Sequence, residues 1–211
     1  MMIYNKMNDI LEELVMHGKT VFTINDASLL MKKPKKYVSK QLSSNRKVIR
    51  VEKGLYFIDT RRGIDLYEIA SQIVFPSYIS LFAAFQYYSI TDQVISTYSV
   101  ISLKRHRTIN FGEYRIEFRT IKKERFFGFE KVQNAYIASL EKAFVDSLYL
   151  NTPAFSYVQE AFDRALTESN LNLQRIKEYA ERMKSGSVNK KLSLLLDSGI
   201  KKRRGGDQHY R

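Results

Sequence analysis

The chain has 211 residues, of which 44% are hydrophobic, and its 14 tyrosines and 13 phenylalanines exclude a wholly disordered protein because they can form a packed core. It contains no cysteine, which excludes disulfides and thiolate zinc sites, and its three histidines are too scattered in sequence to predict a metal cluster, so we expect no metal and no cofactor. The net charge is +13, an excess that is typical of proteins that bind nucleic-acid phosphates.

The positive charge is distributed unevenly. Residues 1–63 hold 13 basic and 6 acidic side chains, and residues 64–200 hold 17 and 15. Residues 32–53 alone carry nine basic side chains against one acid, Glu52. A generally solvated surface would spread the excess evenly, so this clustering favours a nucleic-acid contact near residues 32–53.

The sequence also predicts the localisation of the protein. It has no run of 18 apolar residues, and acidic residues interrupt its N-terminal segment, MMIYNKMNDILEEL, where a signal peptide needs a continuous apolar core. We therefore expect a soluble, cytoplasmic protein that does not associate with membranes.

Three short helices are predicted near the N-terminus. The first covers residues 5–17, where apolar residues recur at helical spacing, and the second runs from about Ile24 to Met31 behind an N-cap at Thr23 or Asn25. Pro34 then suits the first turn of a third helix, which we expect to end at about Ser44.

The third helix and the segment after it predict a DNA-binding surface. Val38 and Leu42 lie four residues apart and face inward, and the sequence KVIRVEKGLYFID then predicts a β-hairpin with glycine at its turn. Three helices followed by a basic hairpin are typical of a winged helix-turn-helix. The candidate DNA-binding residues are Lys33, Lys35, Lys36, Tyr37, Ser39, Lys40, Ser43, Arg46, Lys47, Arg50 and Lys53.

Two features keep alternative interpretations open. Tyr37 either stacks on a nucleotide beside the lysines or packs against the first helix. The basic cluster at residues 104–107 lies in a predicted strand connection and is either a solvated loop or a secondary contact with DNA or a partner.

The polar stretch at residues 59–65 predicts the boundary between two domains. Residues 1–60 form the expected winged helix-turn-helix, residues 64–200 a second α+β domain, and residues 201–211 a basic disordered tail. In the second domain we expect helices over residues 66–74 and from Pro76 onward, then four or five strands of an antiparallel sheet between residues 94 and 138. A C-terminal helical bundle follows, with helices near residues 139–151, 155–168, 173–184 and 190–199.

One enzyme-like pattern occurs in the chain. Ser139 and Lys142 match S-x-x-K, and residues 184–186 match K-[ST]-G, as in serine acyl-transferring penicillin-binding enzymes, but no S-x-N element lies between them. The acids Glu141 and Asp146 are explained as helix-dipole and solvent-facing residues. We therefore expect that the protein is not an enzyme.

The order of four segments resembles one known family. VIRVEKGLYFI, PSYISLFAAFQYYSITDQ, IASLEKAFVDSLYL and KSGSVNKKLSLLLDSG resemble, in this order and across nearly the whole chain, the AbiEi family of type IV toxin–antitoxin systems. The resemblance implies an antitoxin and transcriptional repressor that binds its own promoter as double-stranded DNA and counteracts a nucleotidyltransferase-like toxin. It leaves direct contact with the toxin open and allows a homodimer on DNA.

A second class of function is also compatible with the sequence. The protein could be an RNA-binding or protein-interaction module in which the winged helix docks a partner. The exposed N-terminal half of the third helix discriminates between the two classes, because a DNA reader keeps basic and polar side chains there, as Lys35, Lys36, Ser39 and Lys40 do.

Overall fold

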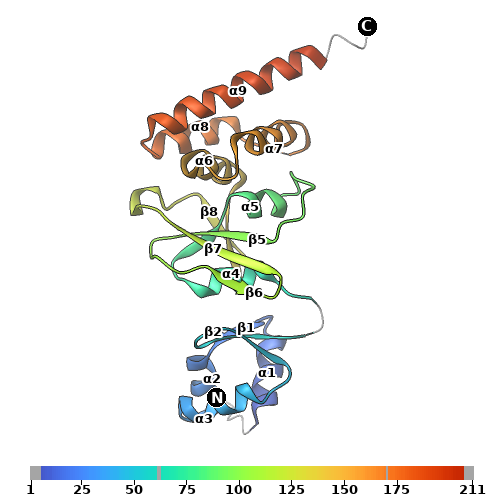
Figure 1. Cartoon of the computed structure of the whole chain (residues 1–211), viewed down its shortest axis with the longest axis vertical. Coiled ribbons are helices and arrows are strands. Elements are labelled where there is room, and N and C mark those ends of the chain that lie inside the picture. Colours follow the sequence, from blue (N-terminus) through green and yellow to red (C-terminus); the bar gives the residue numbers. More distant parts are fainter. Residues whose placement is uncertain (1–5, 61–62, 170, 207–211) are drawn as a thin grey trace. The chain divides into compact units, whose positions relative to one another are not determined.

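The first two helices form where the sequence predicts them. In the computed structural model, which describes residues 6–60, 63–169 and 171–206, α1 spans Met7–Met16 and α2 spans Ile24–Met31 (Figure 1). A capping box begins α2: the Thr23 hydroxyl accepts a hydrogen bond from the Asp26 N–H at 3.2 Å, and the Asp26 carboxylate accepts one from the Thr23 N–H at 2.8 Å. These bonds satisfy N–H groups that have no partner within the helix.

A third helix and a three-stranded sheet complete the first part of the chain. Helix α3 spans Lys35–Ser43 and is followed by the hairpin of β2 (Val48–Glu52) and β3 (Leu55–Ile58). A short strand that the sequence analysis did not predict, β1 (Val21–Thr23), pairs with β3, so the strand order is β1-β3-β2 and every pair is antiparallel. Gly54 occupies the hairpin turn with a φ of +86°, a conformation that glycine adopts without steric cost.

One hydrophobic core holds these elements together. The three helices contribute their apolar faces and the sheet contributes aromatic and aliphatic side chains from β1 and β3. The buried members are Met7, Ile10, Leu11, Leu14, Phe22, Ala27, Met31, Val38, Leu42, Tyr56 and Ile58.

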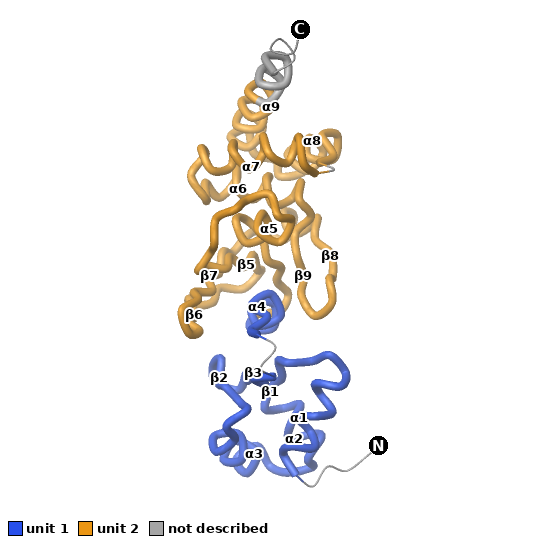
Figure 2. The backbone as a smooth tube through the Cα atoms, turned by 90° about the vertical axis from the view of Figure 1, so that its right-hand side faces the viewer, with its two compact units in different colours: residues 1–73 blue, residues 74–211 orange. Residues whose placement is uncertain are grey.

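Helix α4 (Leu66–Ile73) is grouped with the first part of the chain, which differs from the boundary we expected. The chain divides into two compact units, residues 1–73 and 74–211 (Figure 2). The buried Glu68 carboxylate accepts hydrogen bonds from the backbone N–H groups of Thr20, at 3.0 Å, and Val21, at 3.2 Å. These bonds link α4 to β1. From the sequence we expected the boundary earlier, at residues 59–65, of which residues 61 and 62 lie outside the described part of the chain.

The second unit contains a six-stranded sheet in the order β6-β7-β5-β4-β9-β8. Its strands are β4 (Ser77–Ile79), β5 (Thr97–Ser102), β6 (Ile109–Phe111), β7 (Tyr114–Thr120), β8 (Phe129–Val132) and β9 (Ala135–Ala138), and a 3₁₀ turn, η1 (Lys123–Arg125), precedes β8. We expected an antiparallel sheet, but β5 pairs with β7 in parallel and β4 with β9 in parallel. The chain reverses between β5 and β6 and again at the β6–β7 hairpin, so β7 returns in the direction of β5.

Strand β4 corrects a second expectation. We expected residues 77–79 at the start of a helix that opens at Pro76, but they form a strand between β5 and β9. Tyr78 and Ile79 are buried, and Leu81, which has a φ of +59°, separates the strand from α5 (Phe82–Tyr87). Backbone pairing on both sides of β4 therefore outweighs the helical spacing of the sequence.

Four helices follow the sheet as expected, and α6 is the central one. They are α6 (Leu140–Leu150), α7 (Phe155–Glu168), α8 (Leu173–Arg182) and α9 (Gly186–Gly206). Helix α6 lies among the other three and near α5 (Figure 1), and it also contacts β9. Because it is covered on several sides, Glu141 and Asp146 are buried and do not face solvent as the sequence analysis expected.

The C-terminal segment also differs from the expectation. We expected disorder from residue 201, but the backbone of α9 continues to Gly206, since lysine and arginine favour helix and no glycine interrupts residues 200–204. Residues 207–211 lie outside the described part of the chain. None of the described helices is long and apolar enough to cross a membrane.

Candidate nucleic-acid interface

Helix α3 presents one buried face and one exposed cationic face. Val38 and Leu42 are buried in the core, four residues apart. Pro34 precedes the helix with a φ of −59°, which the proline ring favours. The side chains of the remaining faces point outward because the apolar pair fixes the rotation of the helix about its axis.

The lysines on and beside α3 are available to bind an anionic partner. Lys33, Lys35, Lys36 and Lys40 are all exposed. Within the described part of the chain, no ion pair engages any of these four. Four cationic side chains on and beside one short helix give a local positive charge that no ion pair among the described residues neutralises.

The hydroxyl groups of α3 are less available than its lysines. Ser39 is half-buried, and the exposed Ser43 donates its hydroxyl hydrogen to the Ser39 carbonyl at 2.9 Å. The Ser43 oxygen can still accept a hydrogen bond from a ligand.

Tyr37 lies at a polar groove beside the beginning of α1. The groove has a volume of about 420 Å³, and Asn8, Gln41 and Asn45 contribute to its lining. Asn45 donates a side-chain hydrogen bond to Asn8 at 3.0 Å, which connects the end of α3 to α1. The Tyr37 side chain thus borders the first helix, yet it is 46% exposed, so it can also contact a ligand.

The hairpin contributes two further cations. Arg50 and Lys53 are exposed, and the Arg50 Nε donates a hydrogen bond to the carbonyl of Glu52 at 3.2 Å, next to an irregularity in the β2–β3 register. This bond holds the Arg50 side chain along the strand, while Lys53 stands at the turn.

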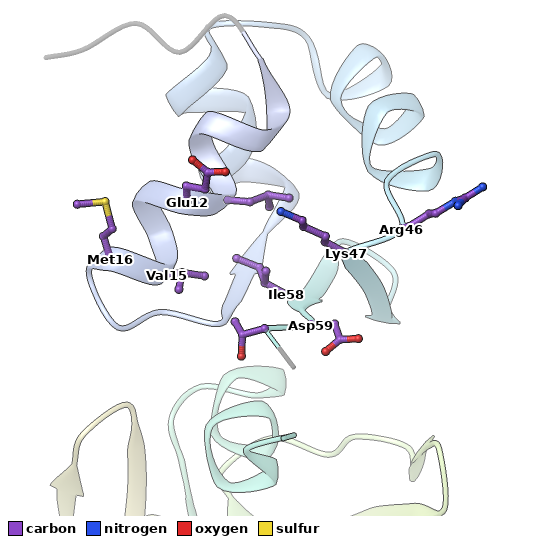
Figure 3. Close-up of a pocket in the computed structure, with 9 residues that line it drawn as sticks. Glu12, Val15, Met16, Arg46, Lys47, Ile58 and Asp59 are labelled. Carbon is purple, nitrogen blue, oxygen red and sulfur yellow. The ribbon is translucent and has the colours of Figure 1, made fainter. Parts of the chain in front are cut away.

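Arg46 and Lys47, in the connection between α3 and β2, point in different directions. Figure 3 shows Arg46 pointing outward, whereas Lys47 extends toward α1. Lys47 borders a hollow of about 800 Å³, which we call the α1–β3 hollow. Its apolar lining comes from Leu11, Val15, Met16 and Ile58, and its polar lining from Glu12, Arg46, Lys47, Asp59 and Thr60.

The α1–β3 hollow is not apparent from the sequence. Its lining comes from two segments, residues 11–16 and 46–60, that are far apart in the chain. The exposed Met16, which breaks the inward apolar pattern of α1, was the one local sign of it.

The basic cluster of the second unit is partly packed. Lys104, Arg105 and Arg107 are exposed between β5 and β6, while the His106 ring lies 4.7 Å from the Phe118 ring of β7. The aromatic contact holds this connection against the sheet and leaves the three cations on its outer side.

The enzyme-like pair of α6 has a structural explanation. The Ser139 hydroxyl caps α6 by accepting a hydrogen bond from the backbone N–H of Lys142 at 3.3 Å. The fully buried Lys142 ammonium pairs with Asp146, whose carboxylate also accepts hydrogen bonds from Tyr78, at 3.0 Å, and Ser80, at 2.8 Å. Burial lowers the pKa of Lys142 and raises the pKa of Asp146, because each charge loses its hydration.

Comparisons with known proteins add no assignment. The chain matches no model of a protein family, and no curated protein matches it.

Proposed function

We propose that the first unit is a winged helix-turn-helix domain and that the protein is a transcriptional repressor that binds double-stranded DNA. In this proposal α3 enters the major groove, and the β2–β3 hairpin is the wing that contacts the neighbouring backbone. The observation that carries the proposal is α3 itself, whose apolar face is buried while its lysines are exposed and lack ion pairs within the described chain.

The roles of the site residues follow from their positions. Lys35, Lys36 and Lys40 lie on α3 and can contact phosphates and base edges, and Arg50 and Lys53 can contact phosphates from the hairpin. Ser39, Ser43 and Tyr37 add hydroxyl groups and one aromatic ring to the same helix.

The resemblance to the AbiEi family extends the proposal to a cellular role. The protein would act as the antitoxin of a type IV toxin–antitoxin system, repress its own operon, and counteract a nucleotidyltransferase-like toxin. We assign the counteracting function to residues 64–200, which comprise α4 and most of the second unit, because their 17 basic and 15 acidic side chains leave them nearly neutral and less suited to phosphate binding.

A titration of the full chain with labelled DNA tests the DNA-binding proposal. Fluorescence anisotropy would compare the protein's own promoter, a random duplex and a single-stranded RNA of equal length. The variant Lys35→Ala/Lys36→Ala/Lys40→Ala should weaken promoter binding, and the matched control Lys19→Ala/Lys131→Ala/Lys190→Ala removes three exposed lysines outside α3.

Two outcomes would contradict the proposal. Equal losses in the two triple variants would show that net charge, and not α3, sets the affinity. Tighter binding to the RNA than to the promoter would favour the RNA-binding alternative. In cells that express the toxin, the α3 variant should no longer repress the promoter but should still protect the cells, since antitoxin action is assigned to residues 64–200.

A further inference from the structure

The α1–β3 hollow has the size and lining of a small-molecule site. Its volume of about 800 Å³ falls within the roughly 300–1,000 Å³ that is typical of ligand pockets. Leu11 and Ile58 are buried at its base and Val15 is half-buried, so the base of the hollow is apolar. An apolar ligand body placed there would be removed from water.

The Lys47 side chain extends over this apolar base. Figure 3 shows Lys47 extending toward α1 on the side where Ile58 also points, while Arg46 points away. The carboxylates of Glu12 and Asp59 point away from Ile58 in the same view. No ion pair of the described residues includes Lys47, so its ammonium group is available to an anionic group of a ligand.

We propose that the α1–β3 hollow binds a small amphipathic anion, whose apolar body lies on Leu11, Val15 and Ile58 and whose charged group pairs with Lys47. DNA is a poorer occupant, because a phosphate backbone gains nothing from an apolar base. Residues 46 and 47 join α3 to β2, so the ligand contacts the connection between the helix and the hairpin that are proposed to bind DNA. Occupancy therefore changes the affinity for the promoter; this regulatory part rests on the proposed function, whereas ligand binding does not.

Two fluorescent probes test the site on the full chain. Anilinonaphthalene sulfonate and N-phenyl-1-naphthylamine share an apolar body, and the first alone carries an anionic sulfonate. Fluorescence titration should give saturable binding at one site, with the sulfonate probe bound roughly tenfold more tightly, as a charge-assisted hydrogen bond of about 1.4 kcal/mol would give.

Two variants and one control test whether the probes bind in the α1–β3 hollow. Lys47→Met should remove the preference for the anionic probe while neutral-probe binding persists, and Val15→Trp should fill the hollow and lose both. Lys19→Met is the matched control, because Lys19 is an exposed lysine of the same unit that does not line the hollow, and it should change neither affinity. Near-ultraviolet circular dichroism checks the folding of each variant, and the exposed Lys47 provides the test even if Val15→Trp fails to fold.

Each contrary result overturns a defined part of the proposal. Equal affinities of wild type and Lys47→Met for the sulfonate probe, or unchanged binding to a folded Val15→Trp protein, would place the probes elsewhere. Sedimentation velocity tests a further occupant. If the wild-type chain forms a dimer that does not bind the probes, and Val15→Trp is monomeric, the hollow is the interface with a second copy of the chain. If saturating probe leaves promoter affinity unchanged, the regulatory part is wrong, whereas a protein that binds the probe but no DNA contradicts the proposed function alone.

Discussion

Glu68 accepts a hydrogen bond at 3.0 Å from the backbone N–H of Thr20, a residue 48 positions earlier in the chain. The same carboxylate also accepts bonds from the Val21 N–H and the Thr20 hydroxyl, so one buried acid satisfies three donors. Because these donors lie at the beginning of β1, the contact connects α4 to the sheet of the first unit.

Substitution of this acid should destabilise the first unit. Glu68→Ala removes the acceptor and leaves two backbone N–H groups without it, and we expect the free energy of unfolding to fall by about 2–3 kcal/mol. Urea unfolding of both proteins measures the difference. Glu12→Ala, which removes an exposed carboxylate from α1 in the same unit, is the control and should change stability by less than about 0.5 kcal/mol. An equal loss in both variants would refute a special role for Glu68.

The two faces of α3 should respond differently to truncation. Val38→Ala and Leu42→Ala each remove buried methyl groups, and we expect each to lower the free energy of unfolding by roughly 2–4 kcal/mol. Lys36→Ala, on the exposed face, should cost within about 0.5 kcal/mol. Thermal unfolding followed by circular dichroism separates the two classes, and a lysine variant as unstable as Leu42→Ala would show that its side chain packs in the fold.

The charge of the first unit sets the expected salt dependence of DNA binding. With Arg50 held along its strand and Lys47 turned toward α1, we expect roughly 4–6 phosphate contacts per protomer and a slope of about −4 to −5 in log K against log salt. Anisotropy titrations at several salt concentrations measure this slope. Deletion of residues 201–211 should flatten it and leave the preferred sequence unchanged; a loss of discrimination between promoter and random DNA would place specificity in the C-terminal segment.

Removing one partner of the buried Lys142–Asp146 pair of α6 should lower the free energy of unfolding more than replacing both partners with apolar residues. Asp146→Ala leaves the Lys142 ammonium buried without its carboxylate, and we expect a loss of about 3–5 kcal/mol. The double variant Lys142→Met/Asp146→Leu removes both charges and should lose less. Urea unfolding of Lys142→Met, Asp146→Leu and the double variant gives the coupling energy. A double variant less stable than both of these single variants would argue against an uncompensated charge as the cause.

Tyr88 should make the second unit sensitive to alkaline pH. Burial, followed by the nearby Glu130 carboxylate, raises the pKa of its phenol from 10.0 to about 12. At a pH between these two pKa values, the unfolded chain has released the phenol proton while the folded chain still keeps it. The free energy of unfolding therefore falls as the pH rises from about 10 to about 12. The Tyr88 hydroxyl also donates to the Ala138 carbonyl at 3.0 Å.

Urea unfolding at about pH 9 and about pH 11 tests this titration. Tyr88→Phe should be less stable than wild type at the lower pH, where the hydrogen bond is intact, and should lose less stability between the two values. An unchanged loss in the variant would assign the alkaline sensitivity to other groups, such as Tyr78, whose pKa is also raised by burial.

Local sequence was sufficient for most helices and for the β2–β3 hairpin. Thr23, Pro34 and Gly54 act on the backbone within a few residues of themselves, so they determine where α2, α3 and the hairpin turn begin. The inward direction of Val38 and Leu42 follows from helical spacing alone, and with it the exposure of the α3 lysines.

Contacts between distant segments decided the rest. Residues 77–79 form a strand because β5 and β9 lie on either side of them. Asp146 is buried where Tyr78 and Ser80, which lie 68 and 66 residues earlier in the chain, donate hydrogen bonds to its carboxylate. Glu68 meets Thr20, and Lys47 turns toward the α1–β3 hollow, only when the chain has folded. Propensity and periodicity act over a few residues, whereas each of these environments is built from segments tens of residues apart, so tertiary packing alone could determine them.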